Sequence, residues 1–184
     1  MSRLQTIDPA TATGKAKTLL DAVKAKLGLV PNMTRVMANS PAVLESYLGF
    51  SGSLEHGALP AKLREQIAIV VAESNECSYC LSAHTAIGKM VGLSPAELST
   101  ARRGESAEGK TAAALAFAQR VTVTNGAVSN DDVKRIKAAG YTDGQVAEIV
   151  ANVALNLFTN VFNKAADTEI DFPKIEAVGT GLPA

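Results

Sequence analysis

Helix start and stop signals recur along the whole chain and divide it into a series of helices. Ser94 and Thr142 each stand three residues before a glutamate or glutamine, which is the spacing of a capping box, and a serine–proline pair at Ser40 opens another helix. Glycines such as Gly28 and Gly140 stand where helix C-termini are expected. Between these signals, apolar residues recur at intervals of three and four residues. The sequence therefore predicts an all-α fold.

The predicted helices form one domain over residues 1–184, which ends in an irregular arm. The last long helix should run from about Asp143 to Asn163, and the segment that follows, about 167–184, contains prolines and glycines that interrupt helices. Only Val121–Thr124 alternates in the manner of a strand, and this run is too short to pair alone. We therefore expect no β-sheet.

Charge and hydropathy limit the partners and the location of the protein. The 18 Lys and Arg residues balance the 18 Asp and Glu residues, so no basic excess is present to bind a phosphate backbone or an anionic membrane. The first residues lack the apolar run of a signal peptide, and the apolar stretch Val146–Phe162 is interrupted by a glutamate and asparagines. We expect a cytoplasmic protein with no nucleic-acid partner and no membrane span.

The apolar residues are mostly small. Aromatic residues make up 4% of the chain, and tryptophan is absent. Small apolar side chains allow close helix packing, but each buries little area, so the core of an isolated subunit would be thin. This composition indicates a homo-oligomer.

The chemistry of the sequence is concentrated in the segment Glu-Cys-Ser-Tyr-Cys-Leu-Ser-Ala-His, which ends at His84 and contains both cysteines. Asn75 is the predicted N-cap of a helix from about Cys77 to Met90. His84 then lies four residues beyond Cys80 and seven beyond Cys77, so all three side chains share one helix face. In a reducing compartment such a cysteine pair serves redox or metal chemistry more often than stapling.

Two effects activate a thiol in this arrangement, and they favour different cysteines. The positive end of the helix dipole lowers the pKa of a thiol in the first turn, which favours Cys77 as the attacking residue. A histidine at i+4 accepts the proton of Cys80 and returns it to a leaving oxygen, which favours Cys80. The other cysteine would then resolve the oxidised intermediate as a disulfide. The residues alone do not decide which of the two cysteines attacks.

Glu65 lies twelve residues before the first cysteine, on a helix that a proline opens. Its neighbours Leu63, Ile67 and Val70 should be buried, which places Glu65 at the edge of the core, facing the following helix. A carboxylate there would orient His84 and stabilise its charge. The pattern predicts a relay of cysteine, histidine and glutamate.

Arg64-Glu65, eleven residues and then Cys-x-x-Cys-x-x-x-His form a pattern that resembles the alkylhydroperoxidase D and carboxymuconolactone decarboxylase family. The resemblance is to the peroxidase-related branch of that family, and it spans most of the chain. It includes four flanking segments: Gly28–Asn32, Ala38–Pro41, Asn160-x-x-Asn163 and Ile170–Pro173.

The resemblance implies an all-helical, AhpD-like fold whose subunits assemble into trimers or dimer-based hexamers. It implies a thiol-dependent alkyl hydroperoxidase or disulfide oxidoreductase that acts on a small peroxide. Carried over by position, Cys80 is the peroxidatic cysteine, Cys77 resolves it, His84 is the base and Glu65 supports the base. The resemblance implies no bound cofactor or metal, and an external dithiol of the lipoyl or thioredoxin type supplies the electrons.

Tyr79 departs from the family pattern. Alkylhydroperoxidase D proper has a second histidine directly before the second cysteine, where this chain has Tyr79. A phenol with a pKa of about 10 can hydrogen-bond but relays protons poorly near neutrality. Decarboxylase members of the family generally lack the cysteine pair, which argues against lactone decarboxylation.

Other interpretations compete with these assignments. Cys77 and Cys80 could form a structural disulfide, or they could join His84 in a zinc site that His56 or Glu73 would complete. The chain could also be a non-catalytic redox-sensing or interaction protein on the same fold, or a carboxymuconolactone decarboxylase-like enzyme.

The remaining polar residues have simpler interpretations. His56 stands at a helix end, where an imidazole is a favourable cap, and we predict a structural role for it. Glu73 is predicted to be a solvated charge. Asparagines recur every four residues along the last helix and could form a subunit seam, a pocket wall or a hydrogen-bonded core row: Asn152, Asn156 and Asn160.

Overall fold

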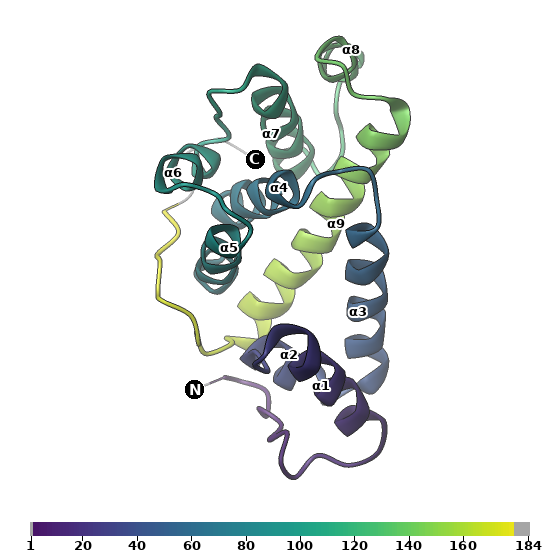
Figure 1. The fold of residues 1–184 in the computed structure, drawn as a ribbon, viewed down its shortest axis with the longest axis vertical. Coiled ribbons are helices and arrows are strands. Elements are labelled where there is room, and N and C mark those ends of the chain that lie inside the picture. Colours follow the sequence, from purple (N-terminus) through teal and green to yellow (C-terminus); the bar gives the residue numbers. More distant parts are fainter. Residues whose placement is uncertain (1, 179–184) are drawn as a thin grey trace.

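The computed structural model describes residues 2–178 (Figure 1). Its helices are α1 (Gly14–Leu27), α2 (Asn32–Met37), α3 (Pro41–Glu55), α4 (Ala61–Ser74), α5 (Ser78–Met90), α6 (Pro95–Arg102), α7 (Gly109–Val123), α8 (Asn130–Ala138) and α9 (Asp143–Ala166). The described residues contain no strand, which confirms the all-α prediction.

The capping signals lie where the sequence places them. Ser94 and Thr142 form complete capping boxes at the N-termini of α6 and α9, and Gly28 ends α1 in a left-handed conformation with φ of 76°. Helix α9 continues beyond its predicted end at Asn163 because the Lys-Ala-Ala that follows favours helix. Asp167, with φ of 50°, ends it.

Helix α4 lies at the centre of the molecule, with α5, α6, α7 and α9 packed around it (Figure 1). Its segment 66–73 is buried on every side, because the sequence there is apolar all round the helix apart from its first and last residues. Leu63, Ile67 and Val70 are buried as predicted. The packed core therefore fixes the position of Glu65 on the same helix.

Helix α9 runs diagonally across the molecule (Figure 1). By length and composition it is the one helix among residues 2–178 that could cross a membrane. Its asparagines face protein, because Asn152, Asn156 and Asn160 are at most 5% exposed. Helix α9 also packs against α3, α4, α5 and α7. In this structure one side of α9 packs against the other helices, and its opposite side is exposed.

Helices α1, α2 and α3 enclose a smaller apolar cluster of their own. Leu20, Met37 and Leu44 are fully buried in it, while a larger cluster surrounds α4. Met33 on α2 packs against both clusters. The candidate site lies where the two clusters meet.

After α9 the chain forms an irregular arm over residues 167–178, and the predicted remainder of the arm, 179–184, lies outside the described residues. The arm runs along α5 and α6 (Figure 1). The backbone N–H of Ile175 donates to Ser82 Oγ of α5 at 2.9 Å. Polar side chains of α5 therefore hold the arm in place.

Glu73 is not the solvated charge that the sequence predicts. Its side chain is 3% exposed, and its Oε2 accepts a hydrogen bond from Arg102 Nε at 2.7 Å. Its Oε1 accepts from the backbone N–H of Val178 at 2.8 Å. Both partners lie on other elements, α6 and the arm, so the local sequence around Glu73 carries no sign of them.

Candidate active site

The structure corrects the predicted start of the cysteine helix. Helix α5 begins at Ser78 with Cys77 as its N-cap, and Cys77 Sγ accepts a hydrogen bond from the backbone N–H of Cys80 at 3.3 Å. Asn75, the predicted cap, ends α4 instead, and its Nδ2 donates to Asn160 Oδ1 at 3.0 Å. Glu76 has a left-handed φ of 54°, which reverses the chain between the two helices. Cys77 is therefore the first residue placed to cap α5.

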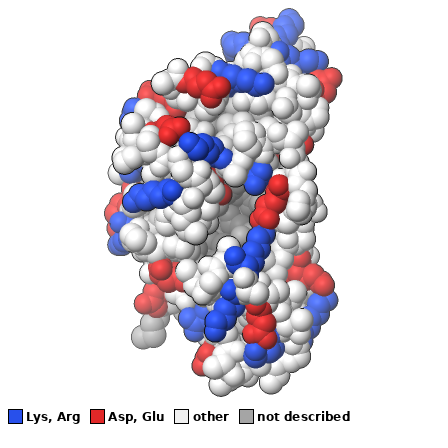
Figure 2. Space-filling view, viewed as in Figure 1, with Lys and Arg blue, Asp and Glu red and all other residues white. Residues whose placement is uncertain are grey.

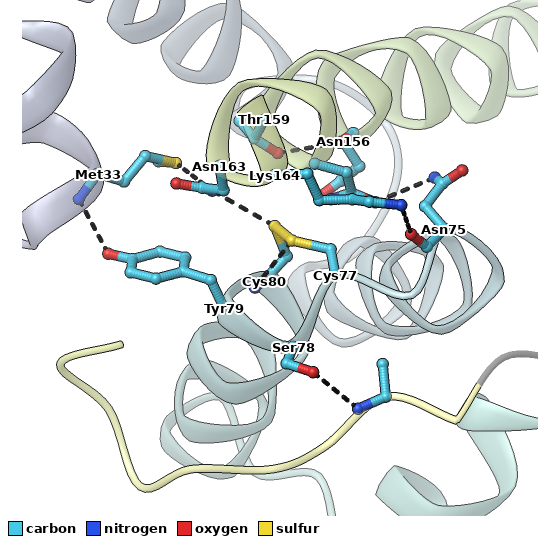
Figure 3. The surroundings of a disulfide bond; sticks show 12 residues. Met33, Asn75, Cys77, Ser78, Tyr79, Cys80, Asn156, Thr159, Asn163 and Lys164 are labelled. Atoms are coloured by element: carbon cyan, nitrogen blue, oxygen red, sulfur yellow. Dashed lines mark hydrogen bonds between the residues drawn. A yellow bond between two sulfur atoms is a disulfide. The ribbon is translucent and has the colours of Figure 1, made fainter. Parts of the chain in front are cut away.

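Cys77 and Cys80 are joined by a disulfide (Figure 3). Each residue is 2% exposed, so the bond is closed off from bulk solvent. Cys80 belongs to the lining of a cavity, whereas Cys77 lies outside that lining. The two cysteines thus differ in access, although both are buried.

The cavity has a volume of about 550 Å³ and lies between the two apolar clusters. Figure 2 shows the surface hollowed over α9, between α5 and α3, with charged side chains beside the hollow. Most of its wall is apolar and includes Val23, Leu27, Leu48, Leu54, Ile87 and Leu155. This volume suits a small organic molecule rather than a macromolecule.

His84 and Glu65 meet on the wall of this cavity. His84 Nδ1 lies 2.8 Å from Glu65 Oε2, and the two side chains are 22% and 18% exposed. A carboxylate at Nδ1 favours the tautomer with the proton on that nitrogen, which leaves Nε2 as the basic atom. Nε2 has no hydrogen-bond partner within residues 2–178. The pair is therefore built to accept a proton at Nε2.

Tyr79 anchors the arm beside the cysteines. Its hydroxyl donates to Asp171 Oδ1 at 3.0 Å and accepts from the backbone N–H of Met33 at 3.0 Å. Burial, together with the Asp171 carboxylate, raises the pKa of Tyr79 well above its ordinary value. The phenol stays protonated and holds its partners together. Phe172 packs edge-on against its ring, with centroids 5.9 Å apart, and both rings line the cavity.

Tyr47 of α3 lines the same cavity. Burial, reinforced by the negative charges of Glu65 and Glu55, raises the pKa of Tyr47 to about 12. Glu55 pairs with Lys26 at 2.5 Å, so this side of the wall is charge-balanced. Tyr47 therefore remains a neutral phenol at any physiological pH.

Asn163 is a site residue that the sequence did not single out for a role. Its Nδ2 donates to Cys80 Sγ at 3.4 Å and to Met33 Sδ at 3.1 Å (Figure 3). Asn163 is 3% exposed and lines the cavity. The only signal for it was the Asn160-x-x-Asn163 segment of the family resemblance, which extends the row of asparagines by one turn.

The structure also decides between the interpretations of the asparagine row. Asn152 and Asn156 are buried, line the cavity, and donate to the backbone carbonyls four residues before them, of Glu148 and Asn152, at 2.8 Å each. Asn160 is fully buried and bonds to Asn75. The row is a hydrogen-bonded core row, part of which is pocket wall.

The residues of the zinc interpretation do not come together as a metal site: Cys77 and Cys80 are bonded to each other in the disulfide. Within residues 2–178, no three His, Cys, Asp or Glu residues lie close enough together to hold a metal ion. His56 is the C-cap residue of α3, at the helix end where the sequence places it. Glu73 pairs with Arg102 instead.

Residues 41–123 match the model of the carboxymuconolactone decarboxylase family. This segment extends from α3 to α7 and includes Glu65, both cysteines and His84. A comparison with curated proteins gives no match.

Several solved structures share the fold. The alkylhydroperoxidase AhpD core structure of an uncharacterized peroxidase-related protein from Ralstonia eutropha JMP134 superposes with a TM-score of 0.83, at 23% identity over 92% of each chain. An uncharacterized peroxidase-related protein from Silicibacter sp. TM1040 gives a TM-score of 0.80 at 22% identity, over 97% of this chain and 92% of that one. The debrominase Bmp8 gives 0.77 at 21% identity, over 92% of this chain and 91% of that one.

The resemblance drawn from the sequence is thereby confirmed: residues 41–123 match the model of the carboxymuconolactone decarboxylase family, and the chain has an AhpD-like helical fold.

Proposed function

We propose that this protein is a thiol-dependent hydroperoxidase that reduces small organic peroxides through the Cys77–Cys80 pair. The observation that carries the proposal is a disulfide whose Cys80 end lines an apolar cavity, beside a histidine–glutamate pair. In this proposal Cys80 is the attacking residue, because it lines the cavity with His84 and Cys77 does not.

The chemistry requires two steps at the cysteines. The Cys80 thiolate attacks the terminal oxygen of the hydroperoxide, an S–O bond forms as the O–O bond breaks, and the alkoxide takes a proton from His84 to leave as an alcohol. The Cys77 thiol then attacks the resulting sulfenic acid, so that water leaves and the disulfide forms. Glu65 holds His84 in the orientation and charge state that these proton transfers need.

An external dithiol of the lipoyl or thioredoxin type completes the cycle. It reduces the disulfide to two thiols and becomes a disulfide itself. Both cysteines are 2% exposed, and Cys80 lines the cavity, so the attacking thiol would reach Cys80 through the cavity. The cycle uses no bound cofactor or metal.

Self-association is part of the proposal, as a trimer or a dimer-based hexamer. The exposed residues of α9 between positions 147 and 161 are all apolar: Ala147, Val150, Ala154, Phe158 and Val161. A continuous apolar helix face of this kind favours burial against another subunit. Light scattering should detect an oligomer that Val161→Glu dissociates, and a monomeric wild-type protein would refute this part.

The experiment that tests the activity measures peroxide consumption with dihydrolipoamide or a thioredoxin system as the reductant. Mass spectrometry after one equivalent of peroxide should show a loss of two hydrogens within one chain. Equal turnover by the wild type and Cys80→Ser would refute the assignment. Activity on a lactone that survives loss of both cysteines would favour a decarboxylase-like enzyme, and a Cys80 pKa above about 8.5 would favour a redox-sensing protein without turnover.

A second candidate is thiol-dependent removal of bromine from a small ring. Bmp8, which shares the fold, is a debrominase that has been crystallised in complex with 2,3,4-tribromopyrrole. The observation in favour is the cavity of about 550 Å³, which is far larger than hydrogen peroxide requires and is mostly apolar. Bromide release from a brominated pyrrole, compared with consumption of cumene hydroperoxide, would distinguish the two.

A further inference from the structure

Asn163 makes the one hydrogen bond that Cys80 Sγ accepts from the described residues. Its Nδ2 lies 3.4 Å from Cys80 Sγ and 3.1 Å from Met33 Sδ (Figure 3). A disulfide sulfur and a thioether sulfur carry no proton, so both can only accept. The two sulfurs therefore fix the orientation of the amide, with the nitrogen towards them and Oδ1 away from them.

The other end of the amide has no partner. Asn163 Oδ1 is buried and finds no hydrogen-bond donor within residues 2–178. Buried amide oxygens are almost always paired, because leaving one unpaired costs free energy. Asn163 lines the cavity, so a molecule bound beside Cys80 can supply the missing donor.

We propose that Asn163 is a further catalytic residue, whose Nδ2 stabilises the Cys80 thiolate and whose Oδ1 binds the O–H group of the peroxide. The role of Oδ1 in binding the peroxide rests on the function proposed above, whereas the role of Nδ2 in stabilising the thiolate does not. The class of substrate that this geometry selects carries a protic group at its reacting end and an apolar body that fits the apolar wall.

The two hydrogen bonds of the Asn163 amide can persist through the whole proposed reaction. The thiolate attacks the oxygen that bears the hydrogen, and the S–O bond forms as the O–O bond breaks. That oxygen keeps its hydrogen and becomes the sulfenic acid of Cys80, while the alkoxide takes a proton from His84 and leaves. The same O–H therefore donates to Asn163 Oδ1 before and after the transfer. Nδ2 donates to the sulfur while it is a thiolate, when its acceptor strength is greatest.

Other groups around Cys80 also influence its thiol. Cys77 is joined to Cys80 by the disulfide, and the titratable groups of the cavity wall include Tyr79 and His84 of α5, Glu65 of α4 and Tyr47 of α3. Asp171 of the arm bonds to Tyr79. Lys164 Nζ donates to the backbone carbonyl of Asn75. A test of Asn163 must therefore leave all of these groups in place.

The chain offers a clean background for the test. It contains two cysteines, so Cys77→Ser leaves Cys80 as the only thiol. In that background, the rate of alkylation by iodoacetamide against pH gives the pKa of Cys80. Asn163→Leu keeps the approximate volume and removes both polar atoms, and we expect it to raise the Cys80 pKa by about one unit, which is a tenfold change in thiolate population. Asn163→Asp keeps an acceptor but adds a charge beside the sulfur, and it should raise the pKa further.

Asn160→Leu is the matched control. Asn160 is a fully buried amide on the same helix, but it bonds to Asn75 and lies outside the cavity lining. Its substitution should leave the Cys80 pKa within about 0.3 units of the background protein. If a general loosening of the core were the cause of the shift in Asn163→Leu, Asn160→Leu would shift the Cys80 pKa as well. If Asn163→Leu folds poorly, as judged by circular dichroism, Asn163→Ala provides the same measurement with less steric change.

The role of Oδ1 is measured with both cysteines present. At a pH above the pKa of each variant, where the thiolate is fully formed, Asn163→Leu should still reduce cumene hydroperoxide about tenfold more slowly. An unchanged Cys80 pKa together with an unchanged limiting rate would overturn the proposal. A raised pKa in a protein that consumes no peroxide would support the Nδ2 role and overturn the peroxidase assignment, so the two failures are separable.

Discussion

The two sides of α5 differ in how completely their polar groups are paired. Towards the arm, Ser82 Oγ donates to the Ser78 carbonyl at 2.7 Å and accepts from the backbone N–H of Ile175 at 2.9 Å. Towards the cavity, His84 Nε2 and Asn163 Oδ1 have no hydrogen-bond partner within residues 2–178. Ser82 is thus fully paired on the arm side, whereas the cavity side keeps two polar atoms that no described residue pairs and that are free to bind a ligand or a proton.

The contrast has an energetic meaning. Each satisfied hydrogen bond on the arm side contributes about 0.5–1.5 kcal/mol to folding, whereas a buried acceptor without a partner costs about 1–3 kcal/mol. The cavity side therefore lowers the stability of the free protein, and a substrate that supplies the missing donor recovers it. Substitutions on the cavity side should therefore change turnover, and substitutions on the arm side should change stability.

The largest effect is expected at Cys80. Cys80→Ser removes the nucleophile, so peroxide turnover should fall by at least about 10³-fold. Ser78→Ala changes the arm side of the same helical turn and should retain turnover within about twofold. Peroxide consumption with dihydrolipoamide measures both variants. Similar losses in the two would mean that the sides of α5 are not functionally distinct.

Glu65→Gln should have the next largest effect. Glutamine has the same size but no charge, so it supports a protonated His84 poorly, and the rate should fall about 10- to 100-fold with little change in melting temperature. Glu45→Gln is a suitable control, because Glu45 forms an exposed ion pair with Lys15 on the surface. Equal rates for the two variants would remove Glu65 from the relay.

High pH should destabilise the cavity wall through Tyr47. Its pKa is about 10 when unfolded and about 12 when folded, so above pH 10 the unfolded state loses its proton first and stability falls as the pH rises towards 12. The loss should reach about 1–2 kcal/mol, and Tyr47→Phe should remove that part of it. Urea unfolding of both proteins from pH 8 to 12 measures the difference, and parallel curves would contradict the prediction.

Ser82→Ala should have the smallest effect, and only on stability. The backbone N–H of Ile175 loses its acceptor, so the free energy of unfolding should fall by about 1 kcal/mol and the melting temperature by about 2–4 °C. Turnover should be unchanged. Ser53→Ala is the control, because Ser53 is an exposed serine of α3 that does not contact the arm over residues 167–178. A large loss of activity in Ser82→Ala would show that the arm side takes part in the reaction.

Local signals in the sequence account for most of the fold. The capping boxes at Ser94 and Thr142 and the glycine stop at Gly28 are read from neighbouring residues, and each forms as expected. The contact between Glu65 and His84 could also be anticipated, because each lies at a defined register on its helix and the two helices are consecutive.

The features that could not be predicted depend on residues far apart in the chain. The partners of Glu73 lie on α6 and the arm, and Asn163 reaches Cys80 from a helix that follows much later. The error at Asn75 has a different origin, since the left-handed turn at Glu76 shifts the cap to Cys77, and a non-glycine residue gives little sign of that conformation. The site could therefore be predicted in part from the sequence. Its helical motif is local, but the hydrogen bond from Asn163 to Cys80 Sγ is not.

Phe172 belongs to two structures at once. It packs on Tyr79 as part of the arm, and it forms part of the wall of the cavity beside Cys80. Because Phe172 belongs to the arm and not to a helix, a substitution there would change the cavity wall without changing the packing between the helices. The shape of the cavity therefore depends on an irregular segment as well as on the helical core.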